Sequence, residues 1–441
     1  MFEALRRRVG QFFGEESASP SVPGLLLPGG GARSAYQAGV LRYVAEAFPE
    51  AYFSIQTGVS AGAINAAHLG NHTGTFEEAA EHVVDTWRGR ELDEIIEVES
   101  GLGLLWDLLW DTPETPDRPT SEAVRSTHGV LDTTPLAQSL REQLDVADDT
   151  LTGVGANLDE GRLQALAVVT TDYATGQTVS WVQGEDFDAW ERPDRIGRQT
   201  ELTVDHIMAS AALPLVFPAV RIGDSWYGDG GIRLSAPLAP AVHLGADKIL
   251  AVSTQYARSR AESEQIELRE YPPTAQIIGV LMNSIFLDSL PQDAHTMQRI
   301  NTLLDELPHR KRHGMQPLEL LQIRPSVDLS SLAHDYRGQI PRSIQVLTSS
   351  LGTRERESPD WLSVLLFHPD YIEQLLDVGY NDARDAHEDL EAFLADTAAA
   401  SADPPGLRRA DAGTESAEED GEETPAGSSV ETADDRQPTA E

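Results

Sequence analysis

Short apolar runs alternate with helical patterns through the first 255 residues of the chain. Runs of Leu, Val, Ile and Ala that are typical of buried strands occupy 25–27, 163–171 and 248–253. Amphipathic or small-residue patterns that predict helices occupy 35–47, 76–87, 134–144, 204–212 and 237–244. Because strands that alternate with helices pack into layers, this pattern predicts an α/β fold with three layers.

The order strand, tight turn, helix is clearest at 53–68, where the chain reads FSIQTGVSAGAINAAH. The turn contains Gly58, Ser60 and Gly62 in a G-x-S-x-G pattern. Such a turn is sharp, and small residues are needed on both sides of the serine. Since the positive end of the following helix stabilises negative charge, Ser60 is a candidate nucleophile.

A glycine-rich loop, Pro28-Gly29-Gly30-Gly31-Ala32-Arg33-Ser34, joins the strand at 25–27 to the helix at 35–47. Its amides are unobstructed near a helix N-terminus, an arrangement that receives an anion. A phosphate loop lacks its Lys-Ser/Thr end here, and a dinucleotide fingerprint lacks its last glycine, which is replaced by Ser34. An oxyanion hole fits best, because the serine turn follows one strand later.

A third candidate is Asp229, which lies between Gly228 and the pair Gly230 and Gly231. An aspartate among glycines at a strand end is free to point its carboxylate into a site. The alternative is an ordinary turn aspartate. The residues alone leave both interpretations open.

The later part of the chain is mainly helical. Helical patterns cover 274–307, 343–351, 361–366 and 371–394, and 318–323 is the last predicted strand. Residues 401–441 carry 12 Asp or Glu against 3 Arg, with too little apolar surface to fold. We therefore divide the chain into an N-terminal segment at 1–21, an α/β domain at 22–255 that carries the three candidate motifs, its helical completion at 256–395 and a disordered acidic tail at 396–441.

Two apolar segments are candidates for contact with a membrane. Residues 2–13 place Phe2, Leu5, Val9, Phe12 and Phe13 on one helical face, and 102–110 reads LGLLWDLLW. Each could lie on a lipid surface or, in the plainer interpretation, pack on its own domain.

Composition excludes several classes of function. The chain has no cysteine, no cluster with metal-ligand spacing and a net charge of −39, so thiolate chemistry, metal catalysis and nucleic-acid binding are not expected. No cofactor is implied. No run of 18 apolar residues or secretory signal is found, which favours the cytoplasm, with peripheral contact at the inner face of the membrane as an alternative. An acidic surface with two lysines would suit a high-salt cytoplasm.

With PGGGARSAYQAGVL, GVSAG and YGDGG in this order, the chain resembles the patatin-like phospholipase family. Further likeness runs through 209–220 and 243–254. The resemblance implies a three-layer α/β/α fold with a mainly parallel central sheet and additional C-terminal helices. The chain departs from the family pattern at Pro28, where aspartate is usual, and at Ser34, where glycine is usual.

The resemblance also implies a mechanism. Ser60 would attack a lipid ester, and Asp229 would accept its proton without an intervening histidine. Amides of Gly29, Gly30, Gly31 and Ala32 would hold the oxyanion, with Arg33, Gly58, Gly62, Gly230 and Gly231 as supporting motif residues. A free carboxylate with a pKa of about 4 is a weak base for an alcohol, so contact in a site with little water must strengthen it.

Two alternatives remain. An α/β-hydrolase with a Ser-Asp-His triad shares the G-x-S-x-G turn and would need one of His243, His295, His334 or His368. A lipid-binding protein without catalysis on the same fold is the other, because Pro28 and Ser34 depart from the family pattern.

Overall fold

The computed structural model describes residues 21–88, 132–184, 189–214, 216–258, 289–336 and 363–401. The apolar segments at 2–13 and 102–110, the helix expected at 343–351 and the acidic tail beyond residue 401 lie outside these ranges.

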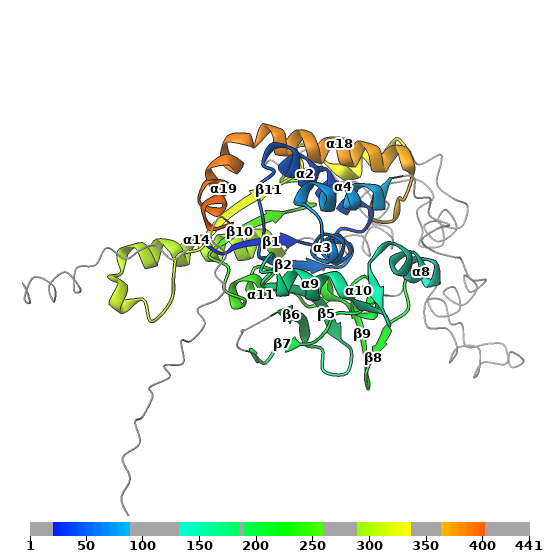
Figure 1. The fold of residues 1–441 in the computed structure, drawn as a ribbon, viewed down its shortest axis with the longest axis horizontal. Coiled ribbons are helices and arrows are strands. Elements are labelled where there is room, and N and C mark those ends of the chain that lie inside the picture. Colours follow the sequence, from blue (N-terminus) through cyan, green and yellow to red (C-terminus); the bar gives the residue numbers. More distant parts are fainter. Residues whose placement is uncertain are drawn as a thin grey trace, which may run out of the picture. The chain divides into compact units, whose positions relative to one another are not determined.

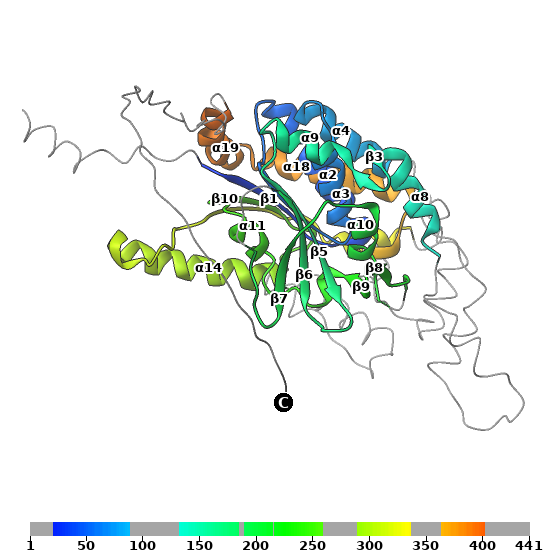
Figure 2. The same cartoon turned by 60° about the horizontal axis from the view of Figure 1, so that its bottom comes forward.

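The central sheet has nine strands, and its main path runs β11-β10-β1-β2-β5-β6-β7 (Figures 1 and 2). Neighbouring strands from β11 to β5 are all parallel, β5 pairs antiparallel with β6, and β6 pairs parallel with β7. The predicted mainly parallel sheet is therefore confirmed. The strands are β1 Pro23–Leu27, β2 Ile55–Val59, β5 Ala165–Asp172, β6 Thr178–Gly184, β7 Arg195–Gln199, β8 Val220–Ile222, β9 Ser225–Asp229, β10 Lys248–Val252 and β11 Glu319–Ile323, with β3 Val146–Ala147 and β4 Thr150–Leu151 in a separate ladder.

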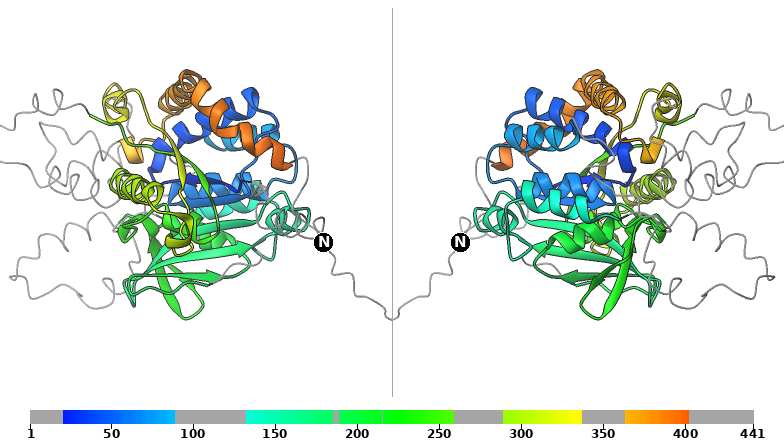
Figure 3. Two further views of the ribbon diagram at one scale, coloured as in Figure 1. Left: turned by 90° about the vertical axis from the view of Figure 1, so that its left-hand side faces the viewer. Right: turned by 90° about the vertical axis from the view of Figure 1, so that its right-hand side faces the viewer.

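Helices cover both faces of this sheet, so the fold has three layers (Figures 2 and 3). Successive residues of a strand point to opposite faces: Leu25 and Leu27 of β1 join the main core, whereas Leu26 packs with Leu238 and Leu290 in a second cluster. The described helices are α2 Ala35–Ala47, α3 Ala61–Asn71, α4 Phe76–Trp87, α8 Thr134–Gln143, α9 Thr152–Asp159, α10 Val204–Ser210, α11 Ala239–His243, α14 Ser289–Glu306, α15 Leu329–His334, α18 Pro369–Asp385 and α19 His387–Ser401, with short 3-10 turns η1 Gly31–Ser34, η2 Gly230–Ile232 and η3 His309–Lys311.

Local chemistry explains why several elements begin and end where the sequence predicts. Helix α4 begins after Thr75, whose side chain and that of Glu78 form a reciprocal capping box. The β5–β6 turn is stabilised by Asp172, whose carboxylate accepts a hydrogen bond from the amide of Ala174, and it closes at Gly176 with φ +68°.

The structure differs from the sequence-based expectation at several places: the short strands β3 and β4 and the helices α9 and α15 were not predicted, and three further differences have a physical reason. Strand β7 was not expected, because it is an edge strand in which only Gly197 is buried, so it lacks an apolar run. The single helix expected at 371–394 is two helices, α18 and α19, divided at Ala386 without a glycine or proline to mark the break. Helix α19 continues to Ser401, beyond the expected start of the tail at 396.

The C-terminal helix α18 packs tightly on α2 through two glycines (Figure 1). A Cβ atom added at Gly39 of α2 would lie 2.0 Å from the carbonyl oxygen of Leu376. A Cβ atom added at Gly379 of α18 would lie 2.1 Å from the carbonyl oxygen of Tyr36. These backbones are therefore closer than any side chain permits, and α18 belongs to the same core as the strands near the N-terminus.

We expect Gly379→Ala to lower the free energy of unfolding by about 1–3 kcal/mol, because the methyl group forces α2 and α18 apart. Gly155→Ala in α9 is the matched control, since its Cβ would meet no atom closer than 3.9 Å. The control should leave stability unchanged or raise it by up to about 1 kcal/mol. Urea denaturation of both variants checks this, and equal stability of the two would contradict the close packing.

Candidate active site

The ends of β2 and β9 meet along one edge of β5. Val59, the last residue of β2, pairs with Val169 of β5, and Asp229, the last residue of β9, pairs with the next residue, Thr170. Because β2 runs parallel to β5 and β9 runs antiparallel to it, the two C-terminal ends point toward each other. The sheet thereby brings together Ser60 and Asp229, which are far apart in the sequence.

Ser60 occupies a sharp turn between β2 and α3. Its backbone has φ 55° and ψ −132°, a conformation that a residue with a side chain rarely adopts. A Cβ atom at Gly62 would lie 2.1 Å from the carbonyl oxygen of Leu27, and one at Gly58 would lie 2.5 Å from Cα of Ala63. Both glycines of the G-x-S-x-G pattern are therefore required by close backbone approach.

The carboxylate of Asp229 is fully buried. Its Oδ1 accepts a hydrogen bond of 2.8 Å from the amide of Gly231, and the Ser60 hydroxyl lies within interaction range of the carboxylate. Burial disfavours the charged form and raises the pKa of Asp229 to about 7, although the Ser60 hydroxyl and the Gly231 amide act in the opposite direction. A carboxylate with this pKa is a much stronger base than the free side chain considered from the sequence.

Sequence reasoning did not identify the last residue of α10 and the turn after it as part of the site. The Oγ of Ser210 accepts a hydrogen bond from the amide of Ser60 at 2.9 Å, and the carbonyl oxygen of Ala212 accepts one from the amide of Asp229 at 3.0 Å. The only signal in the sequence was the likeness of 209–220 to the family, which gives no role to either residue.

The glycine-rich loop lies against the serine turn. A Cβ atom added at Gly29 would lie 2.9 Å from Cβ of Ser60, so only glycine allows this approach. The carbonyl groups of the loop are held from behind, since Thr254 Oγ1 donates to the oxygen of Gly29 and Gln37 Nε2 donates to the oxygen of Pro28. Within the described part of the chain, the amides of Gly29 and Gly30 donate no hydrogen bond.

The second half of the glycine-rich loop, residues 31–34, forms the 3-10 turn η1 that leads into α2. Gly31 begins the 3-10 turn with φ +55°, and the first amides of such a turn have no partner within it, which leaves those of Gly31 and Ala32 available. Ser34 has φ −70°, so its backbone conformation does not require the glycine that is usual in the family. The buried guanidinium of Arg33 donates to Ser330 and Ser363, which ties the loop to the C-terminal part of the chain.

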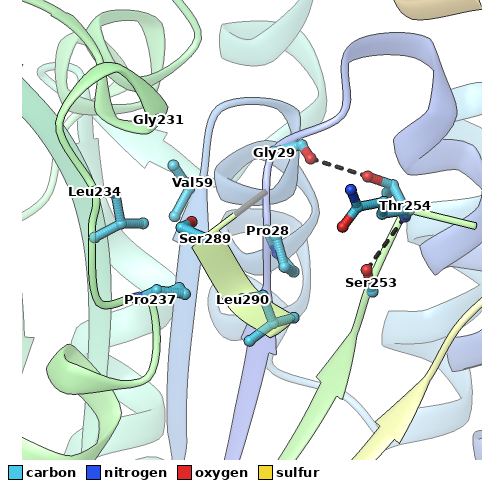
Figure 4. Close-up of a pocket in the computed structure, with 11 residues that line it drawn as sticks. Pro28, Gly29, Val59, Gly231, Leu234, Pro237, Ser253, Thr254, Ser289 and Leu290 are labelled. Carbon is cyan, nitrogen blue, oxygen red and sulfur yellow. Dashed lines mark hydrogen bonds between the residues drawn. The ribbon is translucent and has the colours of Figure 1, made fainter. Parts of the chain in front are cut away.

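A small pocket lies next to these motifs and is lined by Gly29, Val59 and Gly231, but neither Ser60 nor Asp229 lines it (Figure 4). Apolar atoms of Val59, Leu234, Pro237 and Leu290 form much of its wall, and Leu290 belongs to α14, within the predicted helical region after residue 274. Pro28 also lines the pocket, so the other departure from the family pattern lies at the site itself. The lining residues are Pro28, Gly29, Val59, Gly231, Leu234, Pro237, Ser253, Thr254, Gln255, Ser289 and Leu290.

No histidine in the described ranges forms a hydrogen bond with Ser60 or Asp229. His243, one of the four triad candidates, stacks on Trp190 with ring centroids 4.8 Å apart and lines a larger cavity between α11 and α14, whose lining includes neither Ser60 nor Asp229. The described ranges also contain no group of three residues that could hold a metal ion and no helix long and apolar enough to span a bilayer.

The site therefore combines a serine on a strained strand-to-helix turn with a buried carboxylate close to it, and the glycine-rich loop lies against the serine. Residues 25–242 match the family model described as Patatin-like phospholipase. Residues 25–242 therefore form a domain of the patatin-like phospholipase family, and the three-layer architecture is the patatin-like fold.

The solved structures that match the chain share little sequence with it. Human GIVD cytosolic phospholipase A2, solved in complex with methyl gamma-linolenyl fluorophosphonate, is 14% identical with a TM-score of 0.40 over 86% of this chain and 59% of that one. VipD from Legionella pneumophila is 14% identical with a TM-score of 0.30 over 81% of this chain and 67% of VipD. The chain thus spans about three fifths of the length of the human protein. No curated protein matches the chain.

The raised pKa of Asp229 predicts how stability depends on pH. The folded state holds the proton up to about pH 7, whereas an aspartate in the unfolded chain has a pKa of about 4, so the wild type should lose stability as pH rises through this window. Asp229→Asn keeps the acceptor for Gly231 and removes the buried charge. We expect it to be more stable than the wild type above pH 7, by on the order of 4 kcal/mol, with the difference vanishing near pH 4.

Thermal or urea denaturation between pH 4 and 8.5, at high salt to screen the acidic surface, measures this difference. Asp224→Asn removes an exposed carboxylate at the β8–β9 turn and is the control. A stability difference between wild type and Asp229→Asn that stays constant across this range would show that Asp229 titrates normally.

Proposed function

We propose that the protein is a lipid acyl hydrolase that cleaves carboxylic esters through a dyad of Ser60 and Asp229. The observation that carries the proposal is the meeting of a strained serine turn and a fully buried, high-pKa carboxylate at adjacent positions along β5. Membership of the patatin-like phospholipase family supports a lipid ester as substrate.

In the first half of the reaction, Asp229 accepts the proton of the Ser60 hydroxyl while Oγ forms a bond to the ester carbonyl carbon. The carbonyl π electrons move to oxygen and give a tetrahedral oxyanion. When this intermediate collapses, the bond to the alcohol part of the lipid breaks, and the departing alkoxide takes the proton from Asp229. The product at this stage is an acyl group on Ser60.

Water then attacks the acyl group, with Asp229 again accepting the proton, and the fatty acid leaves as Ser60 recovers its proton. Burial makes this chemistry feasible near neutral pH, because a base is most effective when its pKa lies near the working pH. The dyad thus needs no histidine between serine and carboxylate.

The oxyanion would be held by amides of the glycine-rich loop, Gly29, Gly30, Gly31 and Ala32. Amides that are fixed in place and aimed at developing charge stabilise it without reorganisation. Three features support this role: the contact of Gly29 with Ser60, the lack of partners for the first amides and the anchoring of the loop carbonyls by Thr254 and Gln37. Pro28 has no amide hydrogen to contribute, but the four donors that follow it are intact.

We expect Ser60→Ala to abolish hydrolysis of a short-chain p-nitrophenyl ester and of a phospholipid. Asp229→Asn should lower kcat by about 10²–10⁴-fold, because it removes the general base and keeps the shape. His243→Ala, on the far cavity, is the control that should retain wild-type activity. Loss of activity in the histidine variant, with folding intact, would favour a triad, and a wild type that binds lipid but hydrolyses no ester would favour a binding protein.

The dependence of activity on pH tests the role of Asp229 as base. Since only the ionised carboxylate accepts a proton, kcat/KM should rise about tenfold per pH unit below pH 7 and level off above it. Initial rates with a soluble ester between pH 4.5 and 9 measure the profile. An inflection near pH 4 would contradict the proposed base.

A further inference from the structure

The backbone amide of Ser60 needs a hydrogen-bond acceptor that the sheet does not supply. Pairing between β2 and β5 ends at Val59 and Val169, so the next amide, that of Ser60, has lost its place in the ladder. A residue held at φ 55° and ψ −132° persists only when its surroundings fix it. The amide of Ser60 is fixed by the hydroxyl of Ser210.

The Ser210 hydroxyl uses both of its hydrogen-bonding functions in this place. Its Oγ accepts from the amide of Ser60 at 2.9 Å and donates to the carbonyl oxygen of Val169 at 2.6 Å. The side chain has no exposure to solvent, so water cannot replace it. Without this hydroxyl, one amide and one carbonyl group would both be buried and unpaired, which is costly.

The turn that follows Ser210 also fixes the backbone of Asp229 by a hydrogen bond. The carbonyl oxygen of Ala212, two residues after Ser210, accepts from the amide of Asp229 at 3.0 Å. The oxygen of Asp229 in turn accepts from Thr171 Oγ1 at 2.9 Å. Nucleophile and base are therefore each bonded to one short piece of chain, in addition to their contacts with β5.

We infer that Ser210 is a positioning residue that sets the geometry between Ser60 and Asp229, an inference that rests on the function proposed above. It touches neither substrate nor a reacting atom and acts through the backbone of Ser60. Two consequences follow. The amide of Ser60 is already occupied and is not an oxyanion donor, and loss of the hydroxyl changes the rate of the chemical step more than the affinity for substrate.

Steady-state kinetics on a soluble ester test this inference in the full-length protein. Ser210→Ala should lower kcat about 100-fold, a loss typical of a misplacement of about 1 Å, with KM within threefold of the wild type. The pH inflection should stay near 7, because Asp229 remains buried. Ser54→Ala is the matched control, since it removes a buried hydroxyl that bonds the carbonyl of Pro23 at the opposite end of β2, and it should reduce stability without changing kcat.

Ser210→Cys covers the case in which the alanine variant does not fold, because sulfur fills the space but hydrogen-bonds weakly. It should retain the fold and lower kcat about tenfold. Wild-type kcat in a folded Ser210→Ala or Ser210→Cys variant overturns the inference, and so does a loss of kcat of the same size in Ser54→Ala. A wild type without ester hydrolysis overturns the proposed function itself, which separates the two failures.

Discussion

The site depends on the pairing of two strands with successive residues of one edge of β5. Strand β2 arrives in parallel and ends at Val59, and β9 arrives antiparallel and ends at Asp229, so neither strand can extend without meeting the other. The chain must leave the sheet at this point, which produces the sharp turn at Ser60. The juxtaposition of serine and carboxylate is thus a consequence of sheet register.

Burial then determines the chemistry of the carboxylate. Asp229 is fully enclosed, and within the described ranges its one fixed hydrogen-bond donor besides Ser60 is the amide of Gly231, so the hydration that the carboxylate loses on folding is not fully replaced. The ionised carboxylate of Asp229 is therefore less stable in the folded protein than it would be in water. Such local cost is typical of sites whose groups are tuned for proton transfer. Here, the sheet and the turn after α10 supply the surrounding stability.

The C-terminal part of the chain holds the glycine-rich loop in place through hydrogen bonds and helix packing. Arg33 of that loop bonds to Ser330 and Ser363, and α18 packs against α2, the helix that the loop leads into. Gly39 and Gly379 allow this close contact. The helical region after residue 255 is therefore structurally continuous with the strands and motifs that precede it.

The sequence by itself determined the three-layer architecture, most element boundaries, and the identity of Ser60, Asp229 and the glycine-rich loop as candidates. These features depend on local sterics and periodicity: a serine between glycines needs a tight turn, and α2 falls at the 35–47 that its pattern predicts. Strand β7 and the break at Ala386 lack such a signal. Only the tertiary structure decided that Ser60 and Asp229 meet, that Ser210 and Ala212 hold them and that the pKa of Asp229 rises, because register, long-range hydrogen bonds and desolvation arise from residues distant in the chain.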